Sequence, residues 1–254
     1  MKEEYRTDRR DFLRKAALST AGIAGVPYLA SASTIIDNME IPSDMTILFQ
    51  GDSITDADRN RGRYYANDGG GLGGGYVYQI IAELLGSNPG KGFKCYNRGI
   101  SGNKVYQLAD RWNDDCLFLK PDVLSILIGV NDFWHTLTGN YKGTAKTYSD
   151  DFRALLDRTK EQLPNIKLII GEPFAVKGGA AITEQWDKEF PEYREYARQI
   201  AKDYGAAFIP YQEVFDRALD NAPVEYWCPD GVHPSIAGAF LMKNAWLEAF
   251  GTIF

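Results

Sequence analysis

The feature that most constrains the fold of this chain is a nearly continuous apolar segment, Val123–Gly129, in which Ser125 is the single polar side chain. A segment of strand length without polar alternation predicts a strand buried on both faces, as in the middle of a parallel sheet. Four other short apolar segments also predict strands: 45–50, 93–98, 166–170 and 207–209. The chain therefore predicts a five-stranded sheet.

Segments in which apolar residues recur with helical spacing separate these strands. In the segment 76–85, for example, Val77, Ile80 and Ile81 fall on one face of a helix. Further helices are predicted at 104–119, 150–163, 186–204 (interrupted or restarted near Pro191), 214–219 and 236–250. Strands that alternate with helices at this interval indicate an α/β fold, with a parallel sheet covered by helices on both faces.

Length and charge limit the number of domains and the kinds of partner. The chain has 254 residues and a net charge of -6; six basic and four acidic residues lie in the first 32, which leaves -8 for the rest. About 220 residues suit one domain with one core. An acidic surface argues against nucleic acid and anionic membranes as partners. The sequence leaves the oligomeric state open, a homo-oligomer included.

The N-terminus resembles a twin-arginine export signal. Arg9 and Arg10 lie in a basic stretch, a mildly apolar Ala- and Gly-rich segment follows over 16–29, and Ala30–Ala32 fits a small-residue cleavage site. A basic amphipathic helix that stays attached is the alternative. We therefore predict an export signal over residues 1–32, a mature domain over 33–254, a periplasmic or secreted location, and no stable membrane insertion after the signal is removed.

Three cysteines, Cys95, Cys116 and Cys228, are sparse and have no metal-ligand spacing. We expect each to be a buried small apolar residue. In an exported protein one disulfide is open to them, but the sequence does not select a pair. We predict no metal and no organic cofactor.

The predicted first strand runs directly into Gly51–Thr55, which places Ser53 at its carboxyl end. Ligands bind at that edge of an open parallel sheet. A lone serine in such a turn is most simply a helix cap, and its hydroxyl is a weak nucleophile without a base. Ser53 is therefore a candidate nucleophile only if other segments supply a base, a partner for that base and donors for an oxyanion.

The chain has two histidines, so two candidate bases exist, His135 and His233. His233 follows Asp230 by three residues in a loop, where the carboxylate can accept the Nδ1 proton and leave Nε2 for the serine. The chain order Ser, Asp, His is a known order for such triads. His135 has no acid at a similar offset, and we interpret it as a cleft-rim or packing residue.

Oxyanion donors are expected from the ends of the other strands. Gly102 follows the second predicted strand, where a glycine lets a backbone N–H approach a ligand closely. Asn131 follows the third, and its side-chain amide is a neutral donor suited to a developing negative charge. Each alone is more simply a turn residue, but together with Ser53 and His233 they converge on one edge of the predicted sheet.

These residues resemble the SGNH (GDSL-type) hydrolase family. The resemblance lies in four ordered blocks that span nearly the whole mature chain: Gly51–Ile54, Gly102, Gly129–Asp132 and Asp230–Pro234. Within the family the chain looks most like the acetyl xylan esterase branch, on the segments Asn97–Asn103, Arg111–Trp112, Pro121–Asp122 and Ile128–Asp132. The glycine-rich loop over 56–75 is longer than we expect in the acetyl xylan esterase branch.

The resemblance implies a flavodoxin-like three-layer α/β/α sandwich and a serine esterase. It implies Ser53 as nucleophile, His233 as base and Asp230 as its partner. It also implies an oxyanion hole formed by the N–H groups of Ser53 and Gly102 and the side chain of Asn131.

The substrate is expected to be a small-molecule or oligosaccharide ester. Trp134 and Trp227 flank the candidate site in sequence, and aromatic rings suit the apolar faces of sugars, although packing is the simpler role for either. Export and these rings favour an O-acetylesterase acting on carbohydrates, like an acetyl xylan esterase. The alternatives are a lysophospholipase or thioesterase with the same triad, and a non-catalytic carbohydrate-binding protein. Three arginines in the 56–75 loop, Arg59, Arg61 and Arg63, either face an anionic substrate or are solvated.

Overall fold

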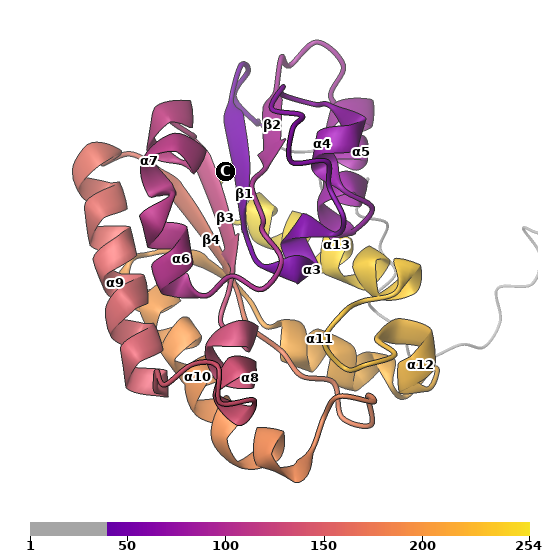
Figure 1. Cartoon of the computed structure of the whole chain (residues 1–254). Helices are drawn as coiled ribbons and strands as arrows, with labels where there is room; N and C mark the ends of the chain where they lie inside the picture. Colours follow the sequence, from indigo (N-terminus) through magenta and orange to yellow (C-terminus); the bar gives the residue numbers. More distant parts are fainter. Residues whose placement is uncertain (1–39) are drawn as a thin grey trace, which may run out of the picture. The chain divides into compact units, whose positions relative to one another are not determined.

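The computed structural model describes residues 40–254, and the predicted export signal with its cleavage site lies outside them. Five parallel strands form one sheet in the order β2-β1-β3-β4-β5 (Figure 1). They are β1 (Thr46–Gly51), β2 (Lys94–Asn97), β3 (Val123–Leu127), β4 (Lys167–Gly171) and β5 (Ala207–Ile209). All five predicted strands are confirmed, and so is the flavodoxin-like α/β/α arrangement.

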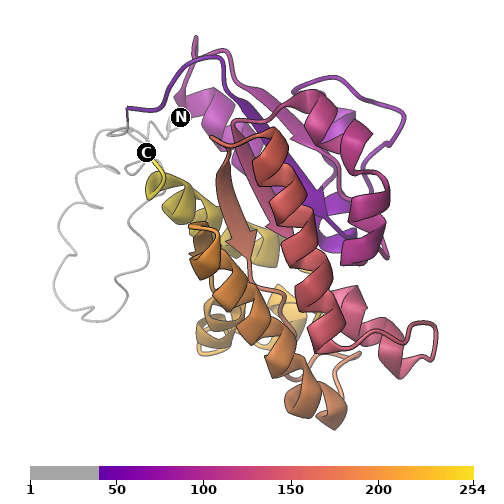
Figure 2. The same cartoon turned by 90° about the vertical axis from the view of Figure 1, so that its left-hand side faces the viewer.

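Helices cover both faces of the sheet, as Figures 1 and 2 show. One layer contains α6 (Val105–Asp110), α7 (Trp112–Asp115), α9 (Ala145–Gln162) and α10 (Glu184–Asp203). The other contains α5 (Tyr76–Ser87), α11 (Tyr211–Ala218) and α13 (Ile236–Gly251). In this strand order the chain leaves β1 in one direction and continues from β3 in the other. The gap between the carboxyl ends of β1 and β3 is therefore the switch point where such sheets bind ligands.

The middle strand is buried as its sequence predicts. Every residue of β3 is buried, including Ser125, whose hydroxyl accepts a hydrogen bond of 2.9 Å from the indole N–H of Trp246. Phe49 of β1 packs against the same indole at 5.1 Å between ring centroids. The hydroxyl of Ser125, the one polar side chain of the apolar segment, is therefore hydrogen-bonded although it is buried in the core.

Two predicted helices differ from the structure. The segment predicted as one helix over 104–119 is divided into α6, α7 and the 3₁₀ turn η1 (Leu117–Leu119). Arg111 lies at the first break, and its guanidinium donates to the carbonyl of Arg98 (2.8 Å) and to Asn103 (3.0 Å), which ties this break to the loop after β2. By contrast, α10 passes through Pro191 without interruption. The rings of Phe190 and Tyr193, one on each side of the proline, stack with centroids 6.0 Å apart, and this packing offsets the lost hydrogen bond.

Short helices occupy segments predicted as loops or turns. They are α3 (Ser53–Asp56), α4 (Gly69–Leu72), α8 (Val130–Leu137) and α12 (Val224–Trp227). The glycine-rich α4 forms because Asp68 caps it, accepting a hydrogen bond of 2.9 Å from the Gly71 N–H. The aspartates that cap α3 and α4 could have indicated those two helices, whereas α8 and α12 begin without a side-chain cap.

All three cysteines are free and buried. Burial raises the pKa of the thiols of Cys95 and Cys116 to about 12, as expected for small core residues. Within residues 40–254 no helix has the length and apolarity to cross a membrane. The same part of the chain contains no group of three or more His, Cys, Asp or Glu side chains placed to hold a metal ion.

Candidate active site

The turn that carries Ser53 connects β1 to α3. Gly51 must be a glycine because a Cβ there would lie 2.3 Å from the carbonyl oxygen of Leu127 on the neighbouring strand. Asp52 then caps α3, accepting a hydrogen bond of 3.0 Å from the Ile54 N–H. Ser53 is the first residue of that helix and lines a cavity at the carboxyl edge of the sheet.

Ser53, His233 and Asp230 form a hydrogen-bonded relay. The Ser53 Oγ lies 2.8 Å from Nε2 of His233, and Nδ1 of His233 lies 2.6 Å from Oδ2 of Asp230. The other carboxylate oxygen of Asp230 accepts the backbone N–H groups of Val232 (2.8 Å) and His233 (2.7 Å). The structure therefore brings together three residues that lie up to 180 positions apart in the sequence.

The electrostatics of Asp230 set the state of the imidazole. Burial alone would raise the pKa of this carboxyl, but hydrogen bonds from His233 and from two backbone N–H groups hold the pKa below its ordinary value. An ionised Asp230 accepts a hydrogen bond from the Nδ1–H of His233, because a carboxylate has no hydrogen to donate. The lone pair of His233 then resides on Nε2 and points at the serine hydroxyl, which is the arrangement of a general base.

The predicted oxyanion donors, Gly102 and Asn131, also follow the carboxyl ends of strands, at the edge of the sheet where Ser53 lies. Gly102 has a φ of +81°, which favours glycine, and a Cβ there would meet no atom within 4 Å, so the space beside this residue is open. Asn131, in the first turn of α8, is 5% exposed and uses one amide N–H to reach the carbonyl of Asn103 at 3.3 Å. Within residues 40–254 the backbone N–H groups of Ser53 and Gly102 have no acceptor. Two backbone donors and the second amide N–H of Asn131 thus remain for a ligand.

The loop after β2 is tied to β1 and to α8. The Ile100 N–H donates to the carbonyl of Gly51 at 3.1 Å, next to the candidate nucleophile Ser53. The Val105 N–H donates to Oδ1 of Asp132 at 3.2 Å. The ammonium of Lys104 donates to Nδ1 of His135 at 2.9 Å. These bonds fix the Gly102 segment between the turn that carries Ser53 and α8.

Sequence reasoning missed this second cluster of ionisable groups. Burial first, and Lys104 second, lower the pKa of His135. Burial raises the pKa of Asp132 to about 7, and it does the same for Asp52 beside the nucleophile. His135 was expected at the cleft rim or in packing, and it lies half-buried against Lys104. Only the position of Asp132 directly after Asn131 could have drawn attention to it.

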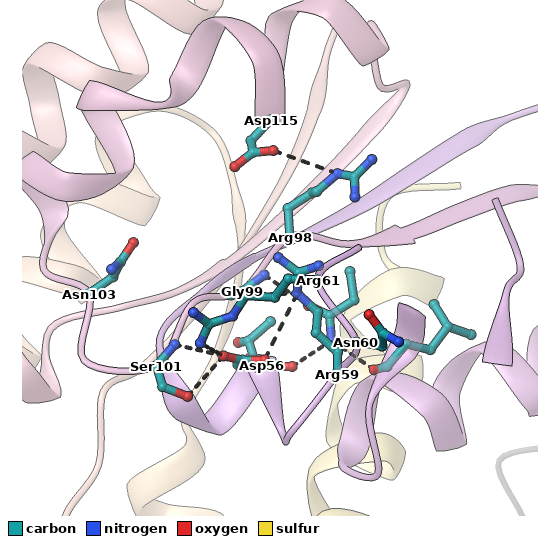
Figure 3. A network of polar contacts seen from close by, with 12 residues as sticks. Asp56, Arg59, Asn60, Arg61, Arg98, Gly99, Ser101, Asn103 and Asp115 are labelled. Atoms are coloured by element: carbon teal, nitrogen blue, oxygen red, sulfur yellow. Dashed lines mark hydrogen bonds and ion pairs between the residues drawn. The ribbon is translucent and has the colours of Figure 1, made fainter. Parts of the chain in front are cut away.

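The arginine-containing loop is neither free nor uniformly solvated (Figure 3). Arg59 is 7% exposed and donates to the carbonyl of Gly99 at 2.8 Å, and Arg61 is paired with Asp56. Asp56 also accepts the backbone N–H and the hydroxyl of Ser101, each at 2.8 Å. The outer Arg63 pairs with Asp68 at 2.6 Å. These arginines therefore secure the loop rather than present charge to a substrate.

The cavity beside Ser53 has a volume of about 400 Å³. Its lining includes both Ser53 and His233, two glycines of the glycine-rich segment, Gly74 and Gly75, and the neighbouring Asp58. The 56–75 loop is thus a wall of the cavity beside Ser53. Close backbone approach explains its glycines, because a Cβ on Gly75 would lie 2.7 Å from that of Ala57.

The two candidate tryptophans have different surroundings. The ring of Trp134 lies 6.3 Å from that of His233 and packs edge-on against Trp186 at 5.6 Å. Trp227 donates its indole N–H to the carbonyl of Ala222 at 3.2 Å, and its ring meets Tyr226. Trp134 therefore borders the relay, whereas the contacts of Trp227 support the loop that precedes Asp230.

Comparison with known proteins gives consistent matches. The model of the GDSL-like lipase/acylhydrolase family matches residues 49–239. An acetylxylan esterase of Geobacillus stearothermophilus is 34% identical over 215 residues, which are 84% of this chain and 97% of that enzyme. The crystal structure of a protein from Parabacteroides merdae, assigned as a GDSL-like lipase, is similar with a TM-score of 0.81 and 51% identity over 83% of this chain and 97% of that one.

A crystal structure of the Geobacillus stearothermophilus acetylxylan esterase covers 84% of this chain and 97% of its own, with a TM-score of 0.74 and 33% identity. Catalytic mutants of that enzyme have a serine, an aspartate or a histidine replaced by alanine. Its mutated aspartate and histidine are three positions apart, as Asp230 and His233 are. The chain therefore belongs to the GDSL-like lipase/acylhydrolase family and is a carboxylic ester hydrolase.

Proposed function

We propose that this chain is a serine esterase that removes O-acetyl groups from carbohydrates. The observation that carries the proposal is the relay in which Ser53 lies 2.8 Å from His233, together with the likeness to an acetylxylan esterase over nearly the full length of that enzyme. Trp134 supports a carbohydrate substrate, because an aromatic ring beside the base suits the apolar face of a sugar.

The reaction follows from the positions of these groups. Ser53 Oγ attacks the ester carbonyl while Nε2 of His233 takes its proton, and Asp230 stabilises the imidazolium that forms. The tetrahedral oxyanion accepts the N–H groups of Ser53 and Gly102 and the amide of Asn131. The C–O bond to the sugar then breaks, and the sugar oxygen leaves with the proton from His233. Water repeats these steps to release acetate and restore Ser53.

A panel of esters tests the proposal. Purified protein should hydrolyse acetylated xylo-oligosaccharides and aryl acetates with higher kcat/KM than aryl esters of long-chain acids. A preference for long acyl chains or for lysophospholipids would reject the deacetylase and favour the lipid esterase. Full activity of Ser53→Ala on every substrate would reject the catalytic assignment itself.

We also propose that residues 1–32 export the folded protein. The support is the twin arginine, Arg9 and Arg10, ahead of an Ala- and Gly-rich segment. Replacing both arginines by lysine should retain the protein in the cytoplasm, as measured by cell fractionation. Unchanged export of that variant would contradict a twin-arginine route.

A further inference from the structure

Two consecutive residues between α3 and α4 have an unusual backbone conformation. Ala57 has a φ of +43° and Asp58 a φ of +59°, both in the left-handed region. An aspartate tolerates this region, but an alanine there is strained. Such strain persists only when the surroundings enforce it, and it concentrates at functional sites.

Contacts on both sides enforce this conformation. On one side, Asp56 and Arg59 are held by Ser101, Arg61 and Gly99 (Figure 3). On the other, the Gly74 N–H donates to the carbonyl of Ala57 at 2.8 Å. A Cβ on Gly73 would lie 2.4 Å from the carbonyl oxygen of Asp56, so only glycine lets this wall approach. The position of Asp58 is therefore fixed by the contacts of the residues on either side of it, and not by hydrogen bonds of its own side chain.

Asp56 and Asp58 are two residues apart and opposite in character. Asp56 is 1% exposed and accepts hydrogen bonds from Ser101 and Arg61. Asp58 is exposed and lines the cavity that contains Ser53 and His233. Within residues 40–254 its carboxylate has neither a hydrogen-bond partner nor an ion-pair partner. A carboxylate left without protein donors in a catalytic cavity is available to donors on a ligand.

The rest of the cavity divides into polar and apolar walls. Ser101 adds a hydroxyl to the same lining, and its own hydrogen is donated to Asp56, so its oxygen is left as an acceptor. Ile54, Pro234 and Ala239 supply apolar lining. A sugar ring has the matching division, with C–H groups on its faces and hydroxyl donors on its edge.

We infer that Asp58 is a specificity-determining residue that accepts hydrogen bonds from free hydroxyl groups of the sugar carrying the scissile acetate, and that its charge disfavours sugars bearing a carboxylate. This inference rests on the proposed deacetylase function. It names the free sugar hydroxyl groups as the part of the substrate that the cavity recognises. Hydrogen bonds to an ionised acceptor are stronger than neutral ones. The enforced backbone also means that little conformational freedom is lost on binding.

The test uses Asp58→Asn, because asparagine keeps the tolerance for a left-handed backbone and removes the charge. Asp58→Gly is the second variant, since glycine accepts this φ without strain and deletes the side chain. The matched control is Asp44→Asn. Asp44 is also an exposed aspartate, with a φ of +60°, but it precedes β1 at the opposite edge of the sheet.

The substrates are an acetylated xylo-oligosaccharide, the same oligosaccharide with a uronic acid branch, and 4-nitrophenyl acetate, which has no sugar hydroxyl. For Asp58→Asn and Asp58→Gly, the ratio of kcat/KM for the neutral sugar to kcat/KM for the aryl acetate should fall about ten- to a hundredfold, mostly through KM. The preference for the neutral over the uronate-bearing sugar should shrink. Asp44→Asn should change neither ratio.

The outcomes separate this inference from the proposed function. If the native protein deacetylates sugars and both Asp58 variants leave both ratios within about twofold of it, the inference is overturned and the proposed function stands. If the native protein ignores acetylated sugars but hydrolyses long-chain esters, the proposed function falls and takes the inference with it. A change in both ratios that Asp44→Asn also produced would be a general charge effect and would overturn the role of Asp58.

Discussion

The two histidines of this chain make the same kind of contact with opposite results. His233 places Nδ1 2.6 Å from the carboxylate of Asp230, whereas His135 places Nδ1 2.9 Å from the ammonium of Lys104. A carboxylate can only accept, so His233 carries its proton on Nδ1 and a lone pair on Nε2. An ammonium can only donate, so His135 has the lone pair on Nδ1 and the proton on Nε2.

The difference shows that the partner, and not the histidine, decides what an imidazole can do. His233 presents a lone pair to a hydroxyl and is suited to act as a base. His135 uses its lone pair to bind Lys104 and so joins α8 to the Gly102 segment. The first region does the proposed chemistry, and the second holds the proposed oxyanion donors in position.

The largest expected effect separates the two histidines directly. His233→Ala and Ser53→Ala should each lower kcat on an aryl acetate by about 10⁶-fold, and the double variant should be no worse, because the two act as one unit. His135→Ala should cost less than about tenfold, since it loosens a contact and removes no reacting group. Steady-state kinetics of the four variants measure this, and equal losses for both histidines would contradict the division of roles.

Asp230→Asn should convert the surroundings of His233 toward those of His135. The backbone N–H groups of Val232 and His233 require an acceptor, so the amide oxygen of Asn would face them and its NH₂ would face Nδ1. Nε2 would then carry the proton and could not accept from Ser53. We expect kcat to fall about 10⁴-fold with the fold intact. NMR of the imidazole should show the exchanged tautomer, and an unchanged tautomer with lost activity would refute this reason.

The second region is tested through Asn131. Asn131→Ala removes the proposed side-chain oxyanion donor, so kcat should fall about 10²–10³-fold with little change in KM. Asn131→Asp is a near-isosteric control that replaces the donor by an acceptor, and its loss should be at least as large. A loss expressed mainly in KM would instead assign Asn131 to ground-state binding.

The smallest effect concerns stability and pH. Burial raises the pKa of folded Asp132 to about 7, above its ordinary value of 3.8, so the folded state holds an extra proton between these two pH values. This contribution to stability is present at acidic pH and is lost as the pH rises toward and through about 7. Asp132→Asn cannot ionise, and its amide oxygen can still accept from Val105.

The variant should therefore lose part of the pH dependence of Tm. Its Tm relative to the native protein should be higher at pH 8 than at pH 5, by roughly 2–4 °C for each kcal/mol of ionisation cost removed. Calorimetry at the two pH values measures this difference. An identical Tm difference at both would contradict a raised pKa at Asp132.

Much of the fold was predictable because its strands are short and continuously apolar. The segment Val123–Gly129 predicts a central strand on composition alone, and the glycines at the strand ends locate the turns. The break at Arg111 was not predictable, because it depends on contacts with the loop after β2 that are remote in sequence. Pro191 predicted an interruption that does not occur, since packing of the buried Phe190 and Tyr193 across the proline overrides the local rule.

The fold was predictable from repeated apolar patterns, whereas the candidate site was predictable from a few specific residues. Ser53, Asp230 and His233 stand in ordered blocks whose residue types have few other joint explanations. The roles of Lys104 and Asp58 could not be predicted from the sequence, because they depend on the residues that surround them in the fold. In a sequence, an aspartate that lines a cavity looks the same as one on the solvated surface. Only the cavity and the left-handed backbone distinguish Asp58.

The most direct test of the central claim, that Ser53 is the nucleophile activated by His233, is covalent labelling with a fluorophosphonate followed by peptide mapping. We expect one adduct per chain, on the peptide that contains Ser53, with loss of esterase activity in proportion to labelling. Ser53→Ala should take up no label, and His233→Ala should be labelled far more slowly. Complete inactivation with the adduct on a different residue, or an active Ser53→Ala, would contradict the account.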